Sequence, residues 1–252
     1  MSQLDRGDVA IHYEVYGSGP AILLSNGYSA TTRMWDPNIA ALSERFTLIL
    51  WDMRGHGQSG SPDEDSAYSE ALTTQDMAAL LDHLGFESAV IGGLSLGGYM
   101  SLAFNLDYPE RVNALLIIDT GPGFKNDAAR AQWNKSAMER ADELENKGAA
   151  ALDASIRESS ELESVNAVGL ARAARHMLTQ SSPRVIESLP TITKPSLVLV
   201  GADDTPFLAA AEYIANKIPN AEKLVIPNAG HVSNIDQPDV FNNHVLEFLN
   251  TR

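Results

Sequence analysis

Short apolar runs that alternate with helical patterns constrain the fold of this chain more than any other feature of its sequence. Five runs have the composition of strands buried on both faces, at residues 21–24, 46–51, 89–91, 114–118 and 197–200. Helical patterns separate the runs from one another. Because parallel neighbours need a crossover between them, this order predicts an α/β fold with a mostly parallel central sheet and helices on both faces.

Two local patterns refine this expectation. Residues 9–15 alternate between apolar and polar side chains, as a half-buried strand does, and the turn residues at 17–20 (Gly-Ser-Gly-Pro) indicate an opening hairpin. The clearest helical pattern begins at a Thr73-Thr74 cap and ends at Gly85.

One stretch of the chain breaks the alternation. Residues 124–188 contain no strand pattern and are rich in Ala, Glu and Arg at helical spacing. We therefore expect a helical cap at 124–188, inserted into a core domain formed by residues 1–123 and 189–252. Half of the 18 basic residues of the chain lie in this insertion. Some are candidates to reach an anionic substrate, with a solvated helical surface as the alternative: Lys125, Arg130, Arg172 and Arg175.

Composition narrows the range of partners. The 252 residues include 18 Lys plus Arg and 33 Asp plus Glu, and the resulting net charge of −15 repels nucleic-acid phosphates and anionic lipid surfaces. The lack of cysteine in the sequence excludes disulfides, thiolate metal sites and cysteine nucleophiles. No apolar run approaches the roughly 20 residues of a membrane span, and the polar N-terminal segment does not resemble a signal peptide. We expect a cytoplasmic protein without nucleic-acid or membrane partners, and a homo-oligomer is possible.

A candidate nucleophile lies where a predicted strand meets a predicted helix. Residues 93–97 (Gly-Leu-Ser-Leu-Gly) fit the nucleophile elbow, in which a serine on a sharp turn is held in a strained backbone conformation. Side chains two positions before and after that serine would collide, and Gly93 and Gly97 avoid the collision. The strand before this segment and the helix after it make Ser95 the candidate nucleophile.

A serine hydroxyl needs a base, and the base needs a carboxylate that orients it. Of the six histidines, His231 is the candidate base, because it follows an apolar run in a loop that can carry a side chain over the sheet. The acid is expected after the strand at 197–200, since open sheets bind ligands at the carboxyl ends of their strands, and Asp203 and Asp204 both lie there. Asp119, at the end of another predicted strand, is a further candidate.

Attack on a carbonyl develops negative charge on oxygen, which main-chain N–H groups must stabilise. Leu96, directly after the candidate nucleophile, is one expected donor, and Tyr28 in the loop after the 21–24 strand is the other. The residues expected to contact the substrate come from that loop and from the insertion: Asn26, Gly27, Phe124 and Trp133. This chemistry requires no metal and no other cofactor.

A further polar segment, residues 52–59 (Asp-Met-Arg-Gly-His-Gly-Gln-Ser), follows the strand pattern at 46–51. It lacks the glycine spacing of a nucleotide-binding loop, and no helix pattern begins there. We expect Asp52 and Arg54 to brace this loop together, with a structural role for His56.

Together these segments resemble the α/β-hydrolase fold family along essentially the whole chain. The matching motifs are Asp-x-Arg-Gly-x-Gly-x-Ser at 52–59, the elbow around Ser95, Gly-x-x-Asp at 201–204 and Gly-His at 230–231. The resemblance implies a sheet of about eight strands and a cap at 124–188 that shapes substrate choice. It also implies the role of each site residue: Ser95 as nucleophile, Asp204 as acid, His231 as base, and Tyr28 and Leu96 as oxyanion-hole donors.

Within this family, residues 32–37 and 41–46 look like the 3-oxoadipate enol-lactonase branch and small carboxylesterases. Where many relatives have His-Gly, this chain has Asn26-Gly27. A serine at the elbow argues against haloalkane dehalogenases and epoxide hydrolases, whose nucleophile is Asp, and against dienelactone hydrolases, which use Cys.

The expected function is therefore a cofactor-free serine hydrolase that cleaves a small carboxylic ester or lactone through an acyl-enzyme. Three alternatives use the same fold. They are a carbon–carbon bond hydrolase of aromatic ring-cleavage products, a cofactor-free haloperoxidase or perhydrolase, and a ligand receptor with slow turnover.

Overall fold

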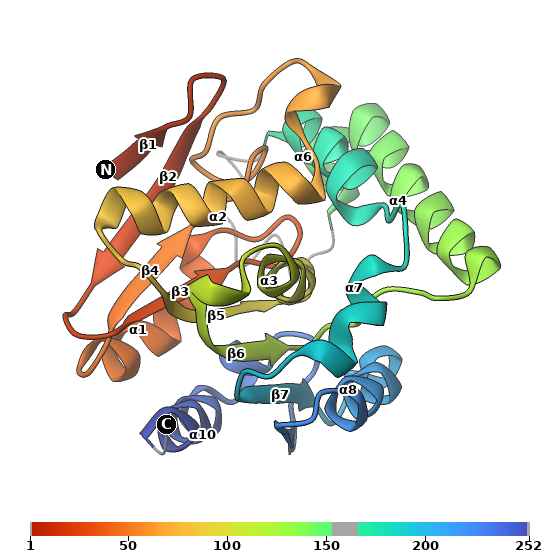
Figure 1. Cartoon of the computed structure of the whole chain (residues 1–252). Coiled ribbons are helices and arrows are strands. Elements are labelled where there is room, and N and C mark those ends of the chain that lie inside the picture. The colour runs from red at the N-terminus through yellow and green to blue at the C-terminus, as the bar shows by residue number, and fades with distance from the viewer. Residues whose placement is uncertain (1, 153–165, 251–252) are drawn as a thin grey trace.

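Eight strands form one sheet at the centre of the structure, a computed structural model that describes residues 2–152 and 166–250 (Figure 1). Their order is β1-β2-β4-β3-β5-β6-β7-β8. All neighbours from β4 to β8 in this order are parallel, and β2 is antiparallel to both β1 and β4. The predicted α/β fold is confirmed. The strands are β1 (Ser2–Asp5), β2 (Ala10–Tyr16), β3 (Ala21–Ser25), β4 (Thr47–Trp51), β5 (Ala89–Leu94), β6 (Val112–Ile118), β7 (Ser196–Gly201) and β8 (Ala221–Ile226).

Helices cover both faces of the sheet (Figure 1). Successive side chains of the central strands point to opposite faces, so that Leu23 and Ile49 join one apolar cluster and Leu24 and Leu50 join another. Because both faces are covered, β3 and β4 are buried along their whole length and carry no polar alternation. The first cluster packs against α2 (Glu70–Leu84), α3 (Leu96–Asp107) and α8 (Thr205–Lys217), and the second against α1 (Asp36–Ser43) and α10 (Pro238–Asn250).

The opening hairpin differs from its prediction. β2 pairs with β1, which precedes it, and the turn at 17–20 leads into β3, which pairs with β4 and β5. β4 lies between β2 and β3 because the parallel crossover from β3 through α1 places it there. Residues 9–15 do belong to an antiparallel hairpin, as predicted. The partner strand is the polar N-terminal segment β1, and not a strand after the turn at 17–20.

The helix before β5 also begins earlier than predicted. The Oγ atom of Ser69 accepts the Leu72 N–H at 3.0 Å and caps α2, so the first turn precedes the predicted cap. The hydroxyls of Thr73 and Thr74 instead donate to carbonyls of the preceding turn. At the other end Gly85 adopts φ 77°, the left-handed conformation expected of a glycine C-cap.

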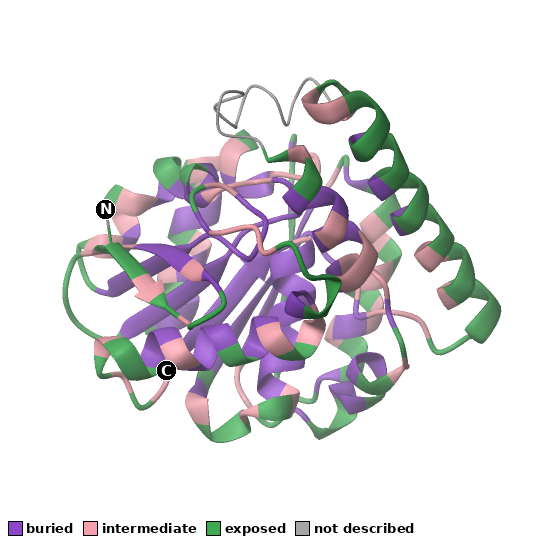
Figure 2. Cartoon of the chain, turned by 90° about the horizontal axis from the view of Figure 1, so that it is seen from above, coloured by how far each residue is buried: buried purple, intermediate pink, exposed green. Residues whose placement is uncertain are grey.

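Between β6 and β7 the structure describes helices and no strand within residues 119–152 and 166–195. The longest of them, α4, is exposed along most of its length (Figure 2), and its buried residues Ala137, Ala141 and Leu144 form one face. α4 packs against α6 and η6. The helical elements of this region are α4 (Asp127–Lys147), η4 (Gly148–Ala151), α6 (Ala167–Ala173), the π-helical turn η6 (Ala174–Leu178) and α7 (Arg184–Ser188).

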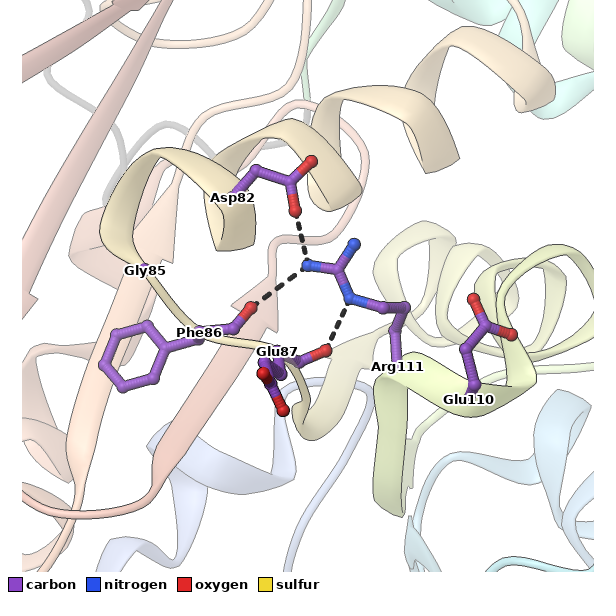
Figure 3. Close-up of a pocket in the computed structure, with 6 residues that line it drawn as sticks. All are labelled: Asp82, Gly85, Phe86, Glu87, Glu110 and Arg111. Atoms are coloured by element: carbon purple, nitrogen blue, oxygen red, sulfur yellow. Dashed lines mark hydrogen bonds and ion pairs between the residues drawn. The ribbon is translucent and has the colours of Figure 1, made fainter.

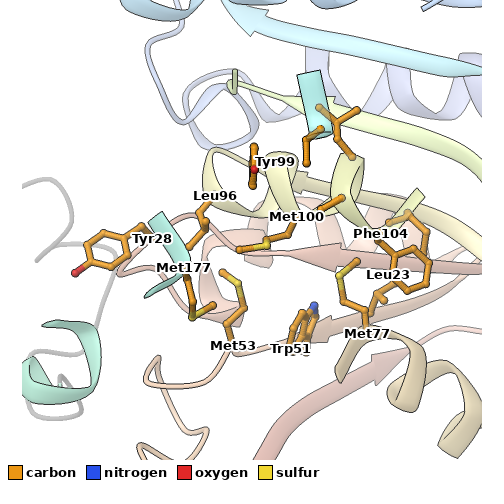
Figure 4. Close-up of a cluster of buried hydrophobic side chains, with 14 of the residues drawn as sticks. Leu23, Tyr28, Trp51, Met53, Met77, Leu96, Tyr99, Met100, Phe104 and Met177 are labelled. Atoms are coloured by element: carbon orange, nitrogen blue, oxygen red, sulfur yellow. The ribbon is translucent and has the colours of Figure 1, made fainter. Parts of the chain in front are cut away.

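This helical region shares its core with the body of the protein. Met177 of η6 is buried in the same apolar cluster as Met53 and Leu96, and Figure 4 shows the three side chains close together. None of the helices in the two described ranges combines the length and the apolar composition that a membrane crossing requires.

Candidate active site

Ser95 occupies the sharp turn between β5 and α3. Its backbone has φ 55° and ψ −114°, a strained conformation for a residue with a side chain. A Cβ atom on Gly93 would lie 2.5 Å from the Gly97 carbonyl carbon, and one on Gly97 would overlap the carbonyl oxygen of Ser25. The two glycines are therefore required for this turn, as their spacing around the serine predicted.

Three side chains from three separate loops form a hydrogen-bonded chain. His231 Nε2 lies 2.9 Å from Ser95 Oγ, and His231 Nδ1 lies 2.8 Å from Asp204 Oδ2. Because a carboxylate only accepts hydrogen bonds, the imidazole proton belongs on Nδ1, and the Nε2 lone pair faces the serine hydroxyl. The structure thus brings together three side chains at the carboxyl edge of the sheet. Ser95 follows β5, Asp204 follows β7 and His231 follows β8.

Burial distinguishes the two neighbouring carboxylates after β7. Asp204 is 4% exposed and lies at the N-terminus of α8, where the helix dipole favours negative charge, whereas Asp203 is exposed. Phe207, one turn further along α8, stacks on the His231 ring with centroids 4.8 Å apart. Phe207 was not predicted from the sequence, although its position three residues after the predicted acid is a signal that could have identified it.

Two main-chain N–H groups beside Ser95 are free to bind an oxyanion. Leu96 is the first residue of α3, and Tyr28 follows Gly27 in the loop after β3. A Cβ atom on Gly27 would lie 3.7 Å from Ser95 Cβ, so this loop passes directly beside the serine. Among the described residues, neither the Leu96 N–H nor the Tyr28 N–H has a hydrogen-bond acceptor.

The Asn26 side chain does not face this space, which corrects the expectation that it contacts the substrate. It is fully buried; its Nδ2 donates to the Trp51 carbonyl at 2.9 Å and to Asp52 Oδ1 at 3.1 Å. Its Oδ1 accepts the Trp35 indole N–H at 2.9 Å. Both polar atoms are therefore used inside the protein, and they hold the loop that carries the Tyr28 N–H.

Asp52 and Arg54 both brace the 52–59 loop, but they do not pair with each other. Each binds other residues. Asp52 accepts the main-chain N–H groups of Thr32 and Gln58 at 2.8 and 2.9 Å. Arg54 is 2% exposed and forms ion pairs with Asp76 of α2 and with Asp8. The predicted Asp52–Arg54 pair is therefore wrong in its pairing and right in its bracing role.

His56 in the same loop is buried and packs edge-to-face against Tyr28, with ring centroids 5.6 Å apart. Its Nδ1 lies 3.0 Å from the Arg54 carbonyl oxygen and donates to it. Burial lowers the pKa of His56 to about 4. The neutral ring therefore supports the loop through these two contacts.

The insertion residues expected to contact substrate make their described contacts within the insertion. The rings of Phe124 and Trp133 lie 5.8 Å apart, and the Trp133 indole donates to the Leu178 carbonyl at 2.7 Å. Contact of these two rings with a substrate stays a prediction.

Most of the candidate cations of the insertion are paired with carboxylates of the chain: Arg130 with Asp127, Arg172 with Asp63, and Arg175 with Asp142 and Glu145. Lys125 is exposed and has no ion-pair partner among the described residues. Arg140, which the sequence analysis did not select, places its guanidinium carbon 5.7 Å from the centre of the Tyr28 ring, and it too has no carboxylate partner in the described ranges.

A hollow in the surface lies away from Ser95, His231 and Asp204 (Figure 3). It lies beside Glu87 and Arg111, at the amino ends of β5 and β6, whereas Ser95 follows the carboxyl end of β5. The Arg111 guanidinium is already held by Asp82 at 2.7 Å and by the carbonyls of Phe86 and Glu87. Within the described residues, no group of three or more His, Asp or Glu side chains is arranged to hold a metal ion.

Known proteins are similar to this chain along its length. A family model described as the alpha/beta hydrolase fold matches residues 20–160. The chain is 28% identical to 3-oxoadipate enol-lactonase 2 of Acinetobacter baylyi, over 97% of this chain and 94% of that protein. A hydrolase of Pseudomonas aeruginosa superposes with a TM-score of 0.81 at 28% identity, with 98% and 97% of the two chains covered. A thermophilic esterase of Thermogutta terrifontis, solved with malate bound, superposes with a TM-score of 0.85 at 26% identity, with 100% and 99% covered.

Proposed function

The chain belongs to the α/β-hydrolase fold family, and on that premise we propose that it is a serine hydrolase of small carboxylic esters or lactones. The observation that carries the proposal is the hydrogen-bonded chain from Ser95 through His231 to Asp204, with two free N–H groups beside the serine. An enol-lactonase and an esterase among the similar proteins support an ester or lactone carbonyl as the reacting group.

Acylation begins with attack of Ser95 Oγ on the substrate carbonyl carbon, while His231 Nε2 takes the hydroxyl proton. The carbonyl oxygen becomes an oxyanion between the N–H groups of Leu96 and Tyr28. Asp204 stabilises the imidazolium and keeps its ring in place. When the carbon–oxygen bond to the alcohol breaks, His231 returns the proton to the leaving oxygen; in a lactone that alcohol stays attached to the acyl group.

Deacylation repeats these steps with water as the nucleophile. His231 takes a proton from the water as its oxygen attacks the acyl carbon, and the same two N–H groups hold the oxyanion. The Ser95–acyl bond then breaks, and the serine oxygen recovers its proton from His231. The His231 side chain is 41% exposed, so water reaches the base without a conformational change.

The helical region between β6 and β7 is the proposed cap, with the extent of 124–188 predicted from the sequence. The phenol of Tyr28 donates to the Leu170 carbonyl of α6 at 2.7 Å, which ties the oxyanion loop to this region. We infer that the loop after β3 and the helices of this region together limit the size of the substrate. Residues 153–165 of the predicted cap lie outside the described residues.

The test is Ser95→Ala, which removes the nucleophile and leaves the fold. We expect kcat on p-nitrophenyl acetate to fall by about 10⁵-fold, because loss of a triad serine removes the acylation step. Turnover by the variant within about tenfold of the native enzyme would exclude the mechanism.

The same assay separates two of the alternatives from an ester or lactone hydrolase. A panel of esters of increasing acyl length, a lactone and a vinylogous keto acid is run on the native protein and on Ser95→Ala. Fastest turnover of the keto acid would favour a carbon–carbon bond hydrolase. Tight binding with kcat far below the usual range of about 1–10³ s⁻¹ would favour a receptor.

A further inference from the structure

Asp119 is a buried carboxylate that the reaction described above does not use. It directly follows β6, is fully buried, and adopts φ 44°, a conformation rare for a residue with a side chain. Its Oδ1 accepts the Gly201 N–H at 2.8 Å. Its Oδ2 accepts both the N–H of Ser233, at 3.1 Å, and its hydroxyl, at 2.6 Å.

The two residues that donate to Asp119 belong to the loops that carry the acid and the base. Gly201 is the last residue of β7, three positions before Asp204, and Ser233 lies two positions after His231. One carboxylate therefore joins the end of β6 to both loops. The neighbouring residues reach the third loop, because the Ser95 N–H donates to the Ile118 carbonyl at 2.9 Å and the Thr120 hydroxyl donates to the Ser95 carbonyl at 2.6 Å.

These contacts also correct the earlier candidate role of Asp119 as the acid itself. Both of its oxygens are occupied by donors other than the imidazole, and the hydrogen bond of His231 Nδ1 goes to Asp204. Burial raises the pKa of the Asp119 carboxyl, while its three donors act in the opposite direction. The N–H groups of Gly201 and Ser233 can only donate, so each carboxyl oxygen must keep a lone pair toward one of them.

We propose that Asp119 is a positioning residue that sets the relative placement of Asp204 and His231. Its effect on rate rests on the proposed function; its effect on the imidazole does not. Without this clamp the two loops keep a main-chain hydrogen bond, from the Asp203 N–H to the Ala229 carbonyl at 2.8 Å, but lose their common tie to β6. A displacement of either loop lengthens the Asp204–His231 hydrogen bond, on which the tautomer and orientation of the base depend.

The variant that tests this clamp is Asp119→Asn. Asparagine tolerates the left-handed backbone conformation, so the turn is kept. Its amide nitrogen must face either the Gly201 N–H or the Ser233 N–H, and that donor loses its acceptor. We expect kcat to fall about 10- to 100-fold with KM changed by less than about threefold, since the groups that bind substrate stay in place.

Asp76→Asn is the matched control. Asp76 is also a fully buried aspartate, and it accepts donors from Arg6 and Arg54, none of them on the loops of the acid or the base. Both variants lose a buried charge and some stability, but only Asp119→Asn should lower kcat in the folded protein. Equal kcat losses in the two variants, or native kcat in Asp119→Asn, would overturn the clamp. Should Asp119→Asn not fold, Ser233→Ala removes one donor alone, and the clamp then requires a kcat loss of about threefold or more.

A second readout does not depend on turnover. In a long-range ¹H–¹⁵N spectrum of the imidazoles, the clamp predicts one tautomer of His231 in the native protein, protonated on Nδ1, and a mixture of tautomers in Asp119→Asn. A single tautomer in Asp119→Asn contradicts the clamp even if the chain hydrolyses no ester. A mixture of His231 tautomers in Asp119→Asn supports the clamp, whether or not the native protein hydrolyses esters. Native protein that hydrolyses no ester would count against the proposed function only.

Discussion

The loop after β3, which we propose to carry an oxyanion-hole N–H, depends on a small number of buried side chains. Asn26 satisfies the Trp35 indole, the Trp51 carbonyl and one oxygen of Asp52, and Asp52 in turn holds the Thr32 N–H. Each buried polar group left without a partner costs about 1–3 kcal/mol. This network therefore holds the loop that carries the Tyr28 N–H. Loss of one member would leave several other buried groups without a hydrogen-bond partner.

Residue by residue, the local motifs could be predicted and their distant partners could not. Ser95 and its two glycines follow from a five-residue pattern, although the Ser25 carbonyl that Gly97 makes room for lies on β3 and cannot be read from that pattern. Asp119 lies 82 positions before Gly201 and 114 before Ser233, and nothing in the sequence fixes which donors meet it. Asn26 was misjudged for the same reason, since its hydrogen bonds close only when β3 and β4 are adjacent.

The buried histidine of the 52–59 loop gives a prediction about acid stability. The pKa of His56 is lowered from 6.5 to about 4, so between these values the unfolded chain binds a proton that the folded chain does not. The contribution of His56 to the free energy of unfolding therefore falls as the pH drops below about 6.5, and this loss levels off below about 4, at about 3 kcal/mol in total. Urea unfolding at intervals from pH 7 to pH 4 measures this slope.

His56→Asn isolates the contribution of this residue. The asparagine amide can still donate to the Arg54 carbonyl but does not titrate, so the variant should lose stability at pH 7 and show a shallower decline toward pH 4 than the native protein. His244→Asn on α10 is the control, because solvent already reaches that ring in the folded state. Parallel pH curves for native protein and His56→Asn would mean that His56 is not held neutral.

At the scale of elements, predicted helices and strands were displaced where two signals competed. Thr73 and Thr74 have the composition of a cap, but Ser69 lies one turn earlier and provides the hydroxyl that α2 uses. β1 carries mostly polar side chains and forms a strand because β2 offers it a free edge. The choice between Ser69 and Thr73 is local and was missed, whereas the pairing of β1 depends on the edge that β2 presents in the folded sheet.

Helix α4 gives a prediction about substrate charge. Arg140 lies over the Tyr28 ring without a carboxylate partner in the described ranges, whereas Arg130, Arg172 and Arg175 are paired. Arg140→Ala should lower kcat/KM for an ester that carries a distal carboxylate about fivefold more than for a neutral ester of equal length, the worth of a partly exposed charge pair of about 1 kcal/mol. The ratio of the two kcat/KM values is the measurement.

Lys135→Ala is the charge-matched control for Arg140. Lys135 lies on the same helix, is exposed, and has its long ion pair with Glu139 at 3.7 Å, so its removal changes the net charge by the same amount. Should both variants change the ratio equally, the effect belongs to the charge of the molecule and not to Arg140. No change in either would indicate that Arg140 offers no charge to the substrate.

At the scale of the whole molecule, the alternation of elements predicted the layers but not the order of the strands. An apolar run before and after each helical pattern along the sequence is enough to predict a parallel sheet that helices cover on both faces. Whether β4 lies outside or inside β3 depends on the direction in which each crossover turns, and this leaves no trace in composition. The carboxyl edge of the sheet was nevertheless predictable as the site, because every crossover returns the chain in the same direction.

The net charge of −15 predicts how the stability of the whole molecule responds to salt. At about 10 mM salt the Debye length is about 30 Å, larger than the expected radius of gyration of about 18 Å, so nearly all charges repel one another; at about 150 mM it is about 8 Å. Screening also weakens attractive pairs such as Arg175–Asp142, but these are short and partly buried and lose less. We therefore expect Tm at pH 7 to rise by about 3–6 °C between these two salt concentrations.

The control is the same pair of Tm measurements at pH 4.7, near the isoelectric point. It should give little or no rise in Tm, since the net repulsion is absent there. A Tm that falls with salt at pH 7 would show that the individual ion pairs outweigh the net charge in this fold.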